Sequence, residues 1–381
     1  MESHGFSRRR WLAVTGSALA GAALGGCATG AGAGWERWAR PLSRRPFAVP
    51  RVTADRVIRS IVGLRPFRPA GFLVRGERMG EKVVVHNYGH GGGGVTLSWG
   101  SSALAVREAA RTEERVAAVV GGGVMGLTTA RLLQDRGWRV TLYTKDLPRH
   151  TTSAVAGGQW APTTVFDDEA LTPEFEAQFR EAVRRSHHAF QALVGAGYGV
   201  RWIENYSLGD APLGVPYYLR HMPELFPSVE DLRPGEHPFP VRHVRRMVTM
   251  MVEPMVFLTR LLSDFREAGG VLEVREFRHR SEVLSLPQPV VMNCAGLGAG
   301  ALFGDQTLVP IRGQLAFLPP DPALDYLTVG GGTGVSYMFP RSDGILLGGS
   351  FERGVSNRRP DPETTERIVR GHRELFARMR S

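Results

Sequence analysis

The residues whose types and spacing could do chemistry begin with a glycine turn in the middle of the chain. Gly121-Gly122-Gly123-Val124-Met125-Gly126 follows the apolar run Val-Ala-Ala-Val-Val at 116–120. A helix-forming stretch at 127–134 and a second strand-like run at 139–144 come next. A strand, a glycine turn, a helix and a second strand within about 30 residues are the pattern that binds a dinucleotide.

Each glycine of this turn has its own physical role. Gly121 permits a tight turn, Gly123 lets a pyrophosphate approach the backbone, and Gly126 lets the helix pack against the strand. The N–H groups of the first helical turn have no partner within the helix and favour negative charge. Val124 and Met125, within the turn, are candidate cofactor contacts as well. The pattern therefore predicts a pyrophosphate site at this turn.

The contact to the adenosine ribose is less determined by the sequence. An acidic residue is expected at the end of the second strand. Lys145 stands there instead, and Asp146 follows it. Either Asp146 or a backbone group binds the ribose hydroxyls, so Lys145 and Asp146 are both candidate cofactor contacts.

A second glycine-rich segment reads His86-Asn-Tyr-Gly-His90-Gly-Gly-Gly-Gly94. The glycine run before 95–110 predicts a loop that enters a helix, with N–H groups that could face a developing negative charge. His86 and His90 have a zinc-like spacing for a helix, but the glycines disfavour a helix and no third ligand is evident. We predict no metal here, and expect the imidazoles to orient the loop by hydrogen bonds. The candidate cofactor contacts are Gly91, Gly92, Gly93, Gly94, Val95 and Thr96.

The second glycine-rich segment and six others resemble segments of D-amino-acid oxidases. The matching segments are Gly63-Leu-Arg65-Pro, the block from His86 to Gly100, Thr151–Pro162, Asn293–Gly296, Arg312-Gly-Gln314, Tyr337-Met-Phe-Pro340 and Leu347-Gly-Gly349. The resemblance implies an α/β fold with a Rossmann-like FAD-binding domain, a mixed β-sheet substrate domain, and FAD as the cofactor. It adds Thr151, Thr152, Gly158, Gln159 and Trp160 to the candidate cofactor contacts.

The resemblance also implies the reaction. Arg65 matches the arginine that binds the substrate carboxylate, and Tyr337 matches the tyrosine that assists it. A guanidinium suits this task because it can form two parallel charge-assisted hydrogen bonds. The implied reaction is oxidative deamination of a D-amino acid by hydride transfer from Cα to flavin N5, with imine hydrolysis and peroxide formation from oxygen. Thr333, where the family often carries a lid aromatic, and Gln159, in place of an apolar residue, leave the side-chain preference open.

The order of the segments departs from the family. The blocks at 51–108 precede the glycine turn instead of closing the chain, and 363–380 resembles the family segment that comes just before 51–65. The sequence therefore predicts a circular permutation joined by the polar link 106–115, with the C-terminal helix ending beside residue 51. The expected domains are 82–160 with 252–303 for FAD, and 51–81, 161–251 and 304–381 for the substrate.

The first 50 residues are expected to direct export. Residues 1–26 place Arg8 and Arg9 before an uncharged stretch too short to span a bilayer, as in a twin-arginine signal. Cys27 follows Leu-Gly-Gly, as in a lipobox, so a lipid anchor at Cys27 and ordinary cleavage nearby both stay open. Residues 27–50 read as a tether. We expect a cell-envelope protein anchored to the outer face of the membrane.

The composition disfavours several other classes of protein. The net charge of +10 over 381 residues is almost all arginine, since Lys82 and Lys145 are the only lysines. The arginines are scattered among acids, which disfavours nucleic-acid binding. Cys27 and Cys294 alone predict neither a disulfide framework nor a cysteine zinc site.

Two alternatives stay open. One is a flavin dehydrogenase or oxidase of another amine or imino acid, which passes electrons to a membrane acceptor instead of oxygen. The other is an anchored flavin-binding protein without turnover. The oligomeric state also stays open, a homodimer included.

Overall fold

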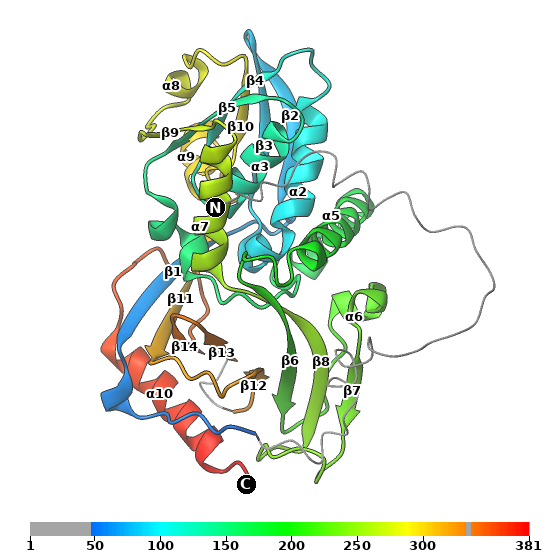
Figure 1. Ribbon diagram of the computed structural model, residues 1–381, viewed down its shortest axis with the longest axis vertical. Helices are drawn as coiled ribbons and strands as arrows, with labels where there is room; N and C mark the ends of the chain where they lie inside the picture. The colour runs from blue at the N-terminus through cyan, green and yellow to red at the C-terminus, as the bar shows by residue number, and fades with distance from the viewer. Residues whose placement is uncertain (1–46, 333–336, 381) are drawn as a thin grey trace, which may run out of the picture. The chain divides into compact units, whose positions relative to one another are not determined.

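Two mixed β-sheets with helices packed on them form the described part of the chain (Figure 1), as the α/β prediction requires. The computed structural model describes residues 47–332 and 337–380. The expected export signal with Arg8 and Arg9, Cys27 and Thr333 lie outside the described residues. Within the described ranges, no helix has the length and apolarity needed to cross a bilayer.

The smaller sheet holds the predicted nucleotide-binding unit. Its strands, in spatial order, are β2 (Leu73–Met79), β3 (Lys82–Tyr88), β10 (Val290–Asn293), β4 (Val116–Val120), β5 (Arg139–Thr144) and β9 (Val271–Val274). All neighbours pair in parallel except the β2–β3 hairpin. A parallel sheet covered by helices on both faces explains the continuous apolar run of β4.

Burial in β4 shows this double covering. Ala117 and Val119 belong to the core cluster that includes residues of α2 and α3, whereas Ala118 and Val120 pack with Leu302 on the opposite face. All four side chains are at most 4% exposed. The turn that follows β4 is therefore anchored on a rigid central strand.

The larger sheet carries the expected substrate side. Its strands, in spatial order, are β1 (Arg59–Phe67), β11 (Val309–Leu318), β14 (Gly344–Gly348), β13 (Tyr337–Arg341), β12 (Tyr326–Gly330), β6 (Val200–Gly209), β8 (His243–Val252) and β7 (Val229–Leu232), with β15 (Glu352–Arg353) paired to β11. The β12–β6 pair is parallel and the others are antiparallel.

Helices predicted at 95–110, 127–134 and 363–380 are among the helices of the described residues. They are α2 (Gly94–Ala109), α3 (Val124–Gln134), α4 (Thr152–Val155), α5 (Pro173–Ala192), α6 (Tyr217–His221), α7 (Pro254–Glu267), α8 (Arg280–Leu284), α9 (Gly298–Phe303) and α10 (Pro362–Ala377). The 3₁₀ turns are η2 (Ala54–Arg56), η3 (Gly91–Gly93), η4 (Pro148–His150), η5 (Asp168–Ala170) and η6 (Pro223–Leu225). The loop-to-helix transition expected at 91–110 and the C-terminal helix expected at 363–380 are both confirmed.

One expected domain boundary is wrong. Residues 51–81 were expected on the substrate side, but β2 pairs with β3 in the smaller sheet through all seven of its residues. The reason is the tight hairpin between Met79 and Lys82, which keeps both strands in one sheet. The boundary therefore falls between β1 and β2.

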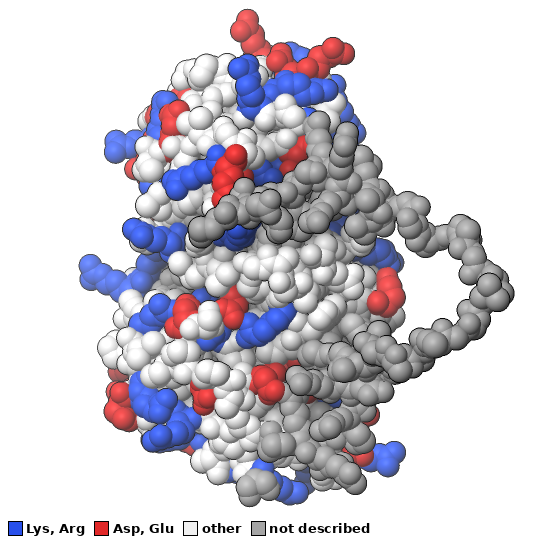
Figure 2. Space-filling view, viewed as in Figure 1, with Lys and Arg blue, Asp and Glu red and all other residues white. Residues whose placement is uncertain are grey.

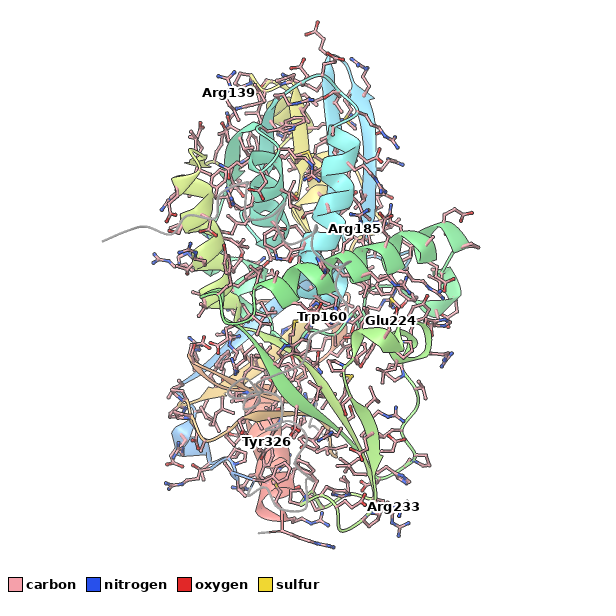
Figure 3. The ribbon with its side chains drawn as sticks, turned by 45° about the vertical axis from the view of Figure 1, so that its right-hand side comes forward. Arg139, Trp160, Arg185, Glu224, Arg233 and Tyr326 are labelled. Atoms are coloured by element: carbon pink, nitrogen blue, oxygen red, sulfur yellow. The ribbon has the colours of Figure 1, made fainter. Side chains whose placement is uncertain are left out.

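The C-terminal helix ends near the start of the described chain, as expected. Tyr326 donates its hydroxyl to the carbonyl of Ala48 at 2.8 Å and lies 3.9 Å from the sulfur of Met379. Figure 3 labels Tyr326 beside α10. The two ends of the described chain thus both contact the side chain of Tyr326.

Charges of both signs are interspersed on the face seen in Figure 2. Exposed ion pairs of the described residues include Arg107 with Glu181 and Arg184 with Glu224. The arginine excess therefore forms no single stripe on this face.

Candidate active site

One cleft of about 880 Å³ receives residues from both sheets. It is lined by the glycine turn after β4, the glycine run before α2, and strands β1, β6, β11, β12 and β13 of the larger sheet. The carboxyl ends of parallel strands are where ligands bind in α/β sheets. Most of the predicted site residues are thereby brought together.

The glycine turn has the geometry that its pattern predicts. Gly121 has a φ of +118°, and a Cβ there would lie 2.3 Å from the carbonyl oxygen of Cys294. A Cβ on Gly126 would lie 1.7 Å from the oxygen of Gly121, so α3 packs against the turn only without a side chain at this position. Gly123, Val124 and Met125 line the cleft at the first turn of α3, whereas Gly126 does not.

The end of β5 offers several candidate ribose contacts. Lys145 and Asp146 both line the cleft, and Lys145 Nζ lies 3.7 Å from a carboxylate oxygen of Glu276. Glu276 follows β9 and lines the cleft as well, together with Arg275. Sequence reasoning missed Glu276 because only the parallel pairing of β5 with β9 brings it here.

The glycine run before α2 is held close to another backbone segment. Gly92 donates its N–H to the carbonyl of Thr164 at 2.9 Å, and a Cβ on Gly91 would lie 2.3 Å from the same oxygen. Of the predicted contacts, Gly91, Gly92, Gly94 and Val95 line the cleft, whereas Gly93 and Thr96 do not. The hydroxyl of Thr96 instead donates to the carbonyl of Ala161.

The two histidines of this segment bind different partners. His86 lies 2.6 Å from Glu77 through Nε2 and 2.9 Å from Asn293 through Nδ1. His90 lies 2.9 Å from the hydroxyl of Ser101. Burial lowers the pKa of His90 to about 3, and burial also lowers the pKa of His86 against the opposing effect of Glu77. Among the described residues, no group of three histidine, cysteine or acidic side chains could hold a metal ion.

The segment after β5 reaches the cleft only in part. Thr151, Thr152, Gly158 and Gln159 line it. Trp160 does not, because its ring is buried between His187 of α5 and Phe226, as Figure 3 shows for its position beside α5.

Arg65 and Tyr337 meet at the substrate side of the cleft. Arg65 lies in β1 and Tyr337 in β13, and Arg65 Nη2 donates to the Tyr337 hydroxyl oxygen at 3.3 Å. Arg65 Nη1 is buried and has no hydrogen-bond partner among the described residues. Arg68, three residues later, is instead bonded to Asp305 at 3.0 Å and to the carbonyl of Gly71 at 2.7 Å. Arg65, unlike Arg68, thus has a nitrogen available to an external anion.

Two glycines on the intervening strands make this pair possible. A Cβ on Gly313 of β11 would lie 2.4 Å from Arg65 Nη1, and a Cβ on Gly348 of β14 would lie 2.1 Å from the Tyr337 ring. The guanidinium and the phenol can therefore lie flat on the sheet only because both positions lack a side chain.

The structure adds cleft residues that the sequence did not indicate. They are Asn205 and Ser207 of β6, Tyr218 of α6, Val329 of β12, Phe339 of β13, and Phe351 and Arg358 after β14. No sequence signal marked them, because each is an ordinary strand, helix or loop residue whose position depends on long-range packing. Phe351 is 58% exposed, and its ring centroid lies 5.9 Å from the guanidinium carbon of Arg65.

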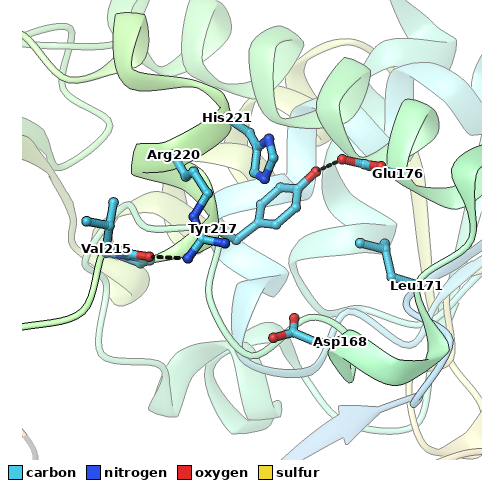
Figure 4. A pocket seen from close by; sticks show the side chains of 8 residues that line it. Asp168, Leu171, Glu176, Val215, Tyr217, Arg220 and His221 are labelled. Carbon is cyan, nitrogen blue, oxygen red and sulfur yellow. Dashed lines mark hydrogen bonds between the residues drawn. The ribbon is translucent and has the colours of Figure 1, made fainter.

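A second, smaller pocket of about 470 Å³ lies at the surface beside α5 and α6 (Figure 4). Its polar groups bind one another: Tyr217 donates to Glu176, and Arg180 bonds to Glu176 at 2.6 Å and to Tyr217 at 3.0 Å. Since these groups are already satisfied, the larger cleft is the better candidate.

The cleft brings a glycine turn of the dinucleotide-binding pattern close to an arginine with an unpaired nitrogen, an arrangement that suits a cofactor-dependent enzyme. The model of the FAD dependent oxidoreductase family, DAO, matches residues 117–380, and the chain belongs to this family.

Individual relatives agree with this assignment. The chain is 33% identical over 266 residues to a D-amino-acid oxidase from Rubrobacter xylanophilus, covering 69% of this chain and 78% of the relative. Among solved structures, it is similar to glycine oxidase from Geobacillus kaustophilus (TM-score 0.52, 19% identity, 68% and 77% coverage). It is also similar to iminodiacetate oxidase from Chelativorans sp. BNC1 (TM-score 0.54, 16% identity, 68% and 79% coverage).

The residues present fit FAD, the cofactor of this family. At Gly121 and Gly91 a Cβ would collide with the backbone oxygens of Cys294 and Thr164, so the two turns pack tightly where they line the cleft. Both turns precede helices that begin at the cleft, and a helix N-terminus stabilises negative charge. The protein is an FAD-dependent oxidoreductase.

We expect Gly313→Ala to weaken binding of a small carboxylate, because the added methyl group would stand 2.4 Å from Arg65 Nη1. Loss of a hydrogen bond to a charged group predicts an increase of about 10- to 100-fold in the dissociation constant of butyrate. The change in visible absorption of bound FAD measures it.

Gly76→Ala is the matched control, since a Cβ there meets nothing closer than 3.6 Å. Unchanged butyrate affinity in Gly313→Ala would show that Arg65 does not need the space above Gly313.

Proposed function

We propose that this protein oxidatively deaminates a D-amino acid. The observation that carries the proposal is the position of Arg65, half-buried in the cofactor cleft with Nη1 unpaired and Nη2 on Tyr337. The similarity to a D-amino-acid oxidase supports the D configuration and the amino-acid substrate.

Arg65 and Tyr337 divide the binding of the carboxylate. Arg65 offers Nη1 and Nη2 to the two carboxylate oxygens, a geometry that suits a planar guanidinium. Because Arg65 donates to the phenol oxygen, the phenol hydrogen of Tyr337 is left to donate to the carboxylate as well. The substrate is thereby fixed at one end, and its Cα is held over the cleft floor.

When bound, FAD supplies the electron acceptor for oxidation at Cα. The start of α2 supports this chemistry, since its first N–H groups stabilise negative charge that accumulates nearby. We propose oxygen as the final acceptor, with peroxide as the second product.

The test is Arg65→Ala, compared with the unmodified enzyme. We expect kcat/KM to fall about 10- to 100-fold or more, mainly through KM, because charge-assisted bonds to the carboxylate are lost. The visible absorption of bound FAD should be unchanged. Arg65→Lys should fall between the two, since lysine keeps the charge but not the paired donors.

Arg107→Ala is the control, because Arg107 is exposed and pairs only with Glu181 on the surface. Initial rates of peroxide release with D- and L-amino acids measure the effect. Dye reduction without peroxide would favour the dehydrogenase alternative. Absence of both dye reduction and peroxide would favour flavin binding without turnover. An unchanged KM in Arg65→Ala would show that Arg65 does not bind the substrate carboxylate.

We also propose that the chain is a circular permutation of its relatives. Residues 59–109 supply β1, β2, β3 and α2 to the two sheets, although the family match begins at residue 117. The Rubrobacter xylanophilus oxidase is matched over 78% of its length, which leaves a segment that 59–109 could represent. Ala48 and Met379 both lie against Tyr326, so the present ends could be joined.

A relinked chain tests this proposal. It begins at Val116, runs to Met379, continues through two glycines into Ala48, and ends at Thr112. We expect it to fold and bind FAD as the original does, because no strand or helix is cut. A chain opened within α2 after Gly100 is the control and should lose FAD. A relinked chain that fails to fold would count against the permutation.

We propose export to the cell envelope with Cys27 as a lipid anchor. Arg8, Arg9 and the residues before Cys27 support this proposal. The double variant Arg8→Lys with Arg9→Lys should remain inside the cell, and Cys27→Ser should be released from membranes in fractionation. Export unaffected by the arginine changes would contradict the twin-arginine assignment.

A further inference from the structure

The residues of the larger sheet that line the cleft form its floor, and their polarity changes from β13 to β6. Tyr337 of β13 is paired with Val329 of β12, and Val329 is paired with Ser207 of β6. Residues in register share one face, and Asn205 lies on that face because it precedes Ser207 by two. The floor thus runs from the Arg65–Tyr337 pair, across apolar side chains, to a polar end on β6.

The distance along this floor fits a substrate side chain. Tyr337 and Ser207 are separated by two strand spacings, roughly 10 Å. A carboxylate held at Arg65 would therefore direct a side chain of several atoms across Val329 and Phe339 toward β6.

Asn205 is the unusual residue at the polar end. Its side chain is 1% exposed and lines the cleft, and its Nδ2 donates to Ser207 Oγ at 3.2 Å. Its Oδ1 is buried and has no partner among the described residues. Whichever way the amide is turned, one polar atom is left unpaired, which is costly for a side chain with only a structural role.

The neighbours of Asn205 are the hydroxyl of Tyr218 and the guanidinium of Arg245, which is paired with Asp231. Tyr218 of α6 lines the same cleft, its hydroxyl is bonded to none of the described residues, and burial raises its pKa to about 12. The charged residues of the cleft lie elsewhere: Arg65, Lys145, Asp146, His150, Arg275, Glu276 and Arg358. Arg245, paired with Ser207 across β8, is already held by both carboxylate oxygens of Asp231 at 2.6 and 3.0 Å.

We propose that Asn205, Ser207 and Tyr218 form a side-chain subsite that selects an uncharged hydrogen-bonding group, such as a carboxamide, at the end of the substrate. A carboxamide carries both donors and an acceptor, so it satisfies the unpaired atom of Asn205 in either orientation. A charged group is disfavoured, because the nearby cation Arg245 is already paired with Asp231. This inference rests on the proposed function.

The test compares three D-amino acids of similar length: D-glutamine, D-methionine and D-glutamate. In the unmodified enzyme, kcat/KM should be highest for D-glutamine. Asn205→Leu should lower kcat/KM about threefold to tenfold for D-glutamine, the range expected for lost hydrogen bonds, and by less than about twofold for D-methionine. The dissociation constant of the 2-oxo acid of glutamine, measured by the absorption of bound FAD, should rise in parallel.

Two measurements distinguish a role of Asn205 in substrate selection from a purely structural role. Thr328→Val is the matched control, since Thr328 Oγ1 is also buried and unpaired but lines no part of the cleft; its substrate preference should stay unchanged. Asn205→Leu should not lower the melting temperature, because it removes an unsatisfied polar atom.

The outcomes distinguish the two levels of the argument. Equal losses for D-glutamine and D-methionine, or a preference of the unmodified enzyme for D-glutamate or D-methionine, would overturn the subsite while leaving the oxidase intact. Absence of oxidation with every D-amino acid would overturn the proposed function, and the subsite with it.

Discussion

The site depends on one uncompensated cation at the surface of a sheet. Arg65 Nη1 is buried without a partner among the described residues, and Nη2 reaches only the phenol of Tyr337. Desolvating a cation without an anion is unfavourable, so the surrounding sheet must hold the guanidinium in place until an anion arrives. Gly313 and Gly348 help to hold it there. Because they lack side chains, the sheet surface stays flat where Arg65 and Tyr337 lie on it.

This constraint also explains why residues before the nucleotide turn belong to the site. Arg65 comes from β1, which pairs along nine residues with β11, and the glycine run at 91–94 leads from β3 into α2. Neither segment could be displaced without removing the cation or the helix N-terminus from the cleft. Residues 59–109 are therefore part of the fold that forms the cleft rather than an addition to it.

Local patterns could be predicted from the sequence, whereas long-range register could not. The turn at Gly121, the helix after Gly94 and the C-terminal helix follow from glycine placement and helical composition within single segments. Asn205 and Ser207 follow from no such signal, because they alternate along β6 like the residues of any half-buried strand. Trp160 was placed at the cofactor by the family resemblance of residues 151–162, but its large ring packs in the core against His187 and Phe226. The boundary before β2 was missed because a hairpin partner is decided by pairing, which composition does not reveal.

Unpaired polar atoms become informative only where they coincide with the cleft. Trp160 Nε1 and Thr328 Oγ1 are buried and unpaired, yet neither residue lines the cleft. Three residues that line the cleft carry a buried unpaired atom: Arg65 Nη1, Asn87 Oδ1 and Asn205 Oδ1. Of these, Arg65 and Asn205 lie on the larger sheet, at opposite ends of one face. One end is cationic and the other neutral, so a ligand that satisfies both must carry an anion at one end and an uncharged polar group at the other. A zwitterionic amino acid with a polar side chain meets that requirement, and it is the spacing of the strands between Tyr337 and Ser207 that sets its length.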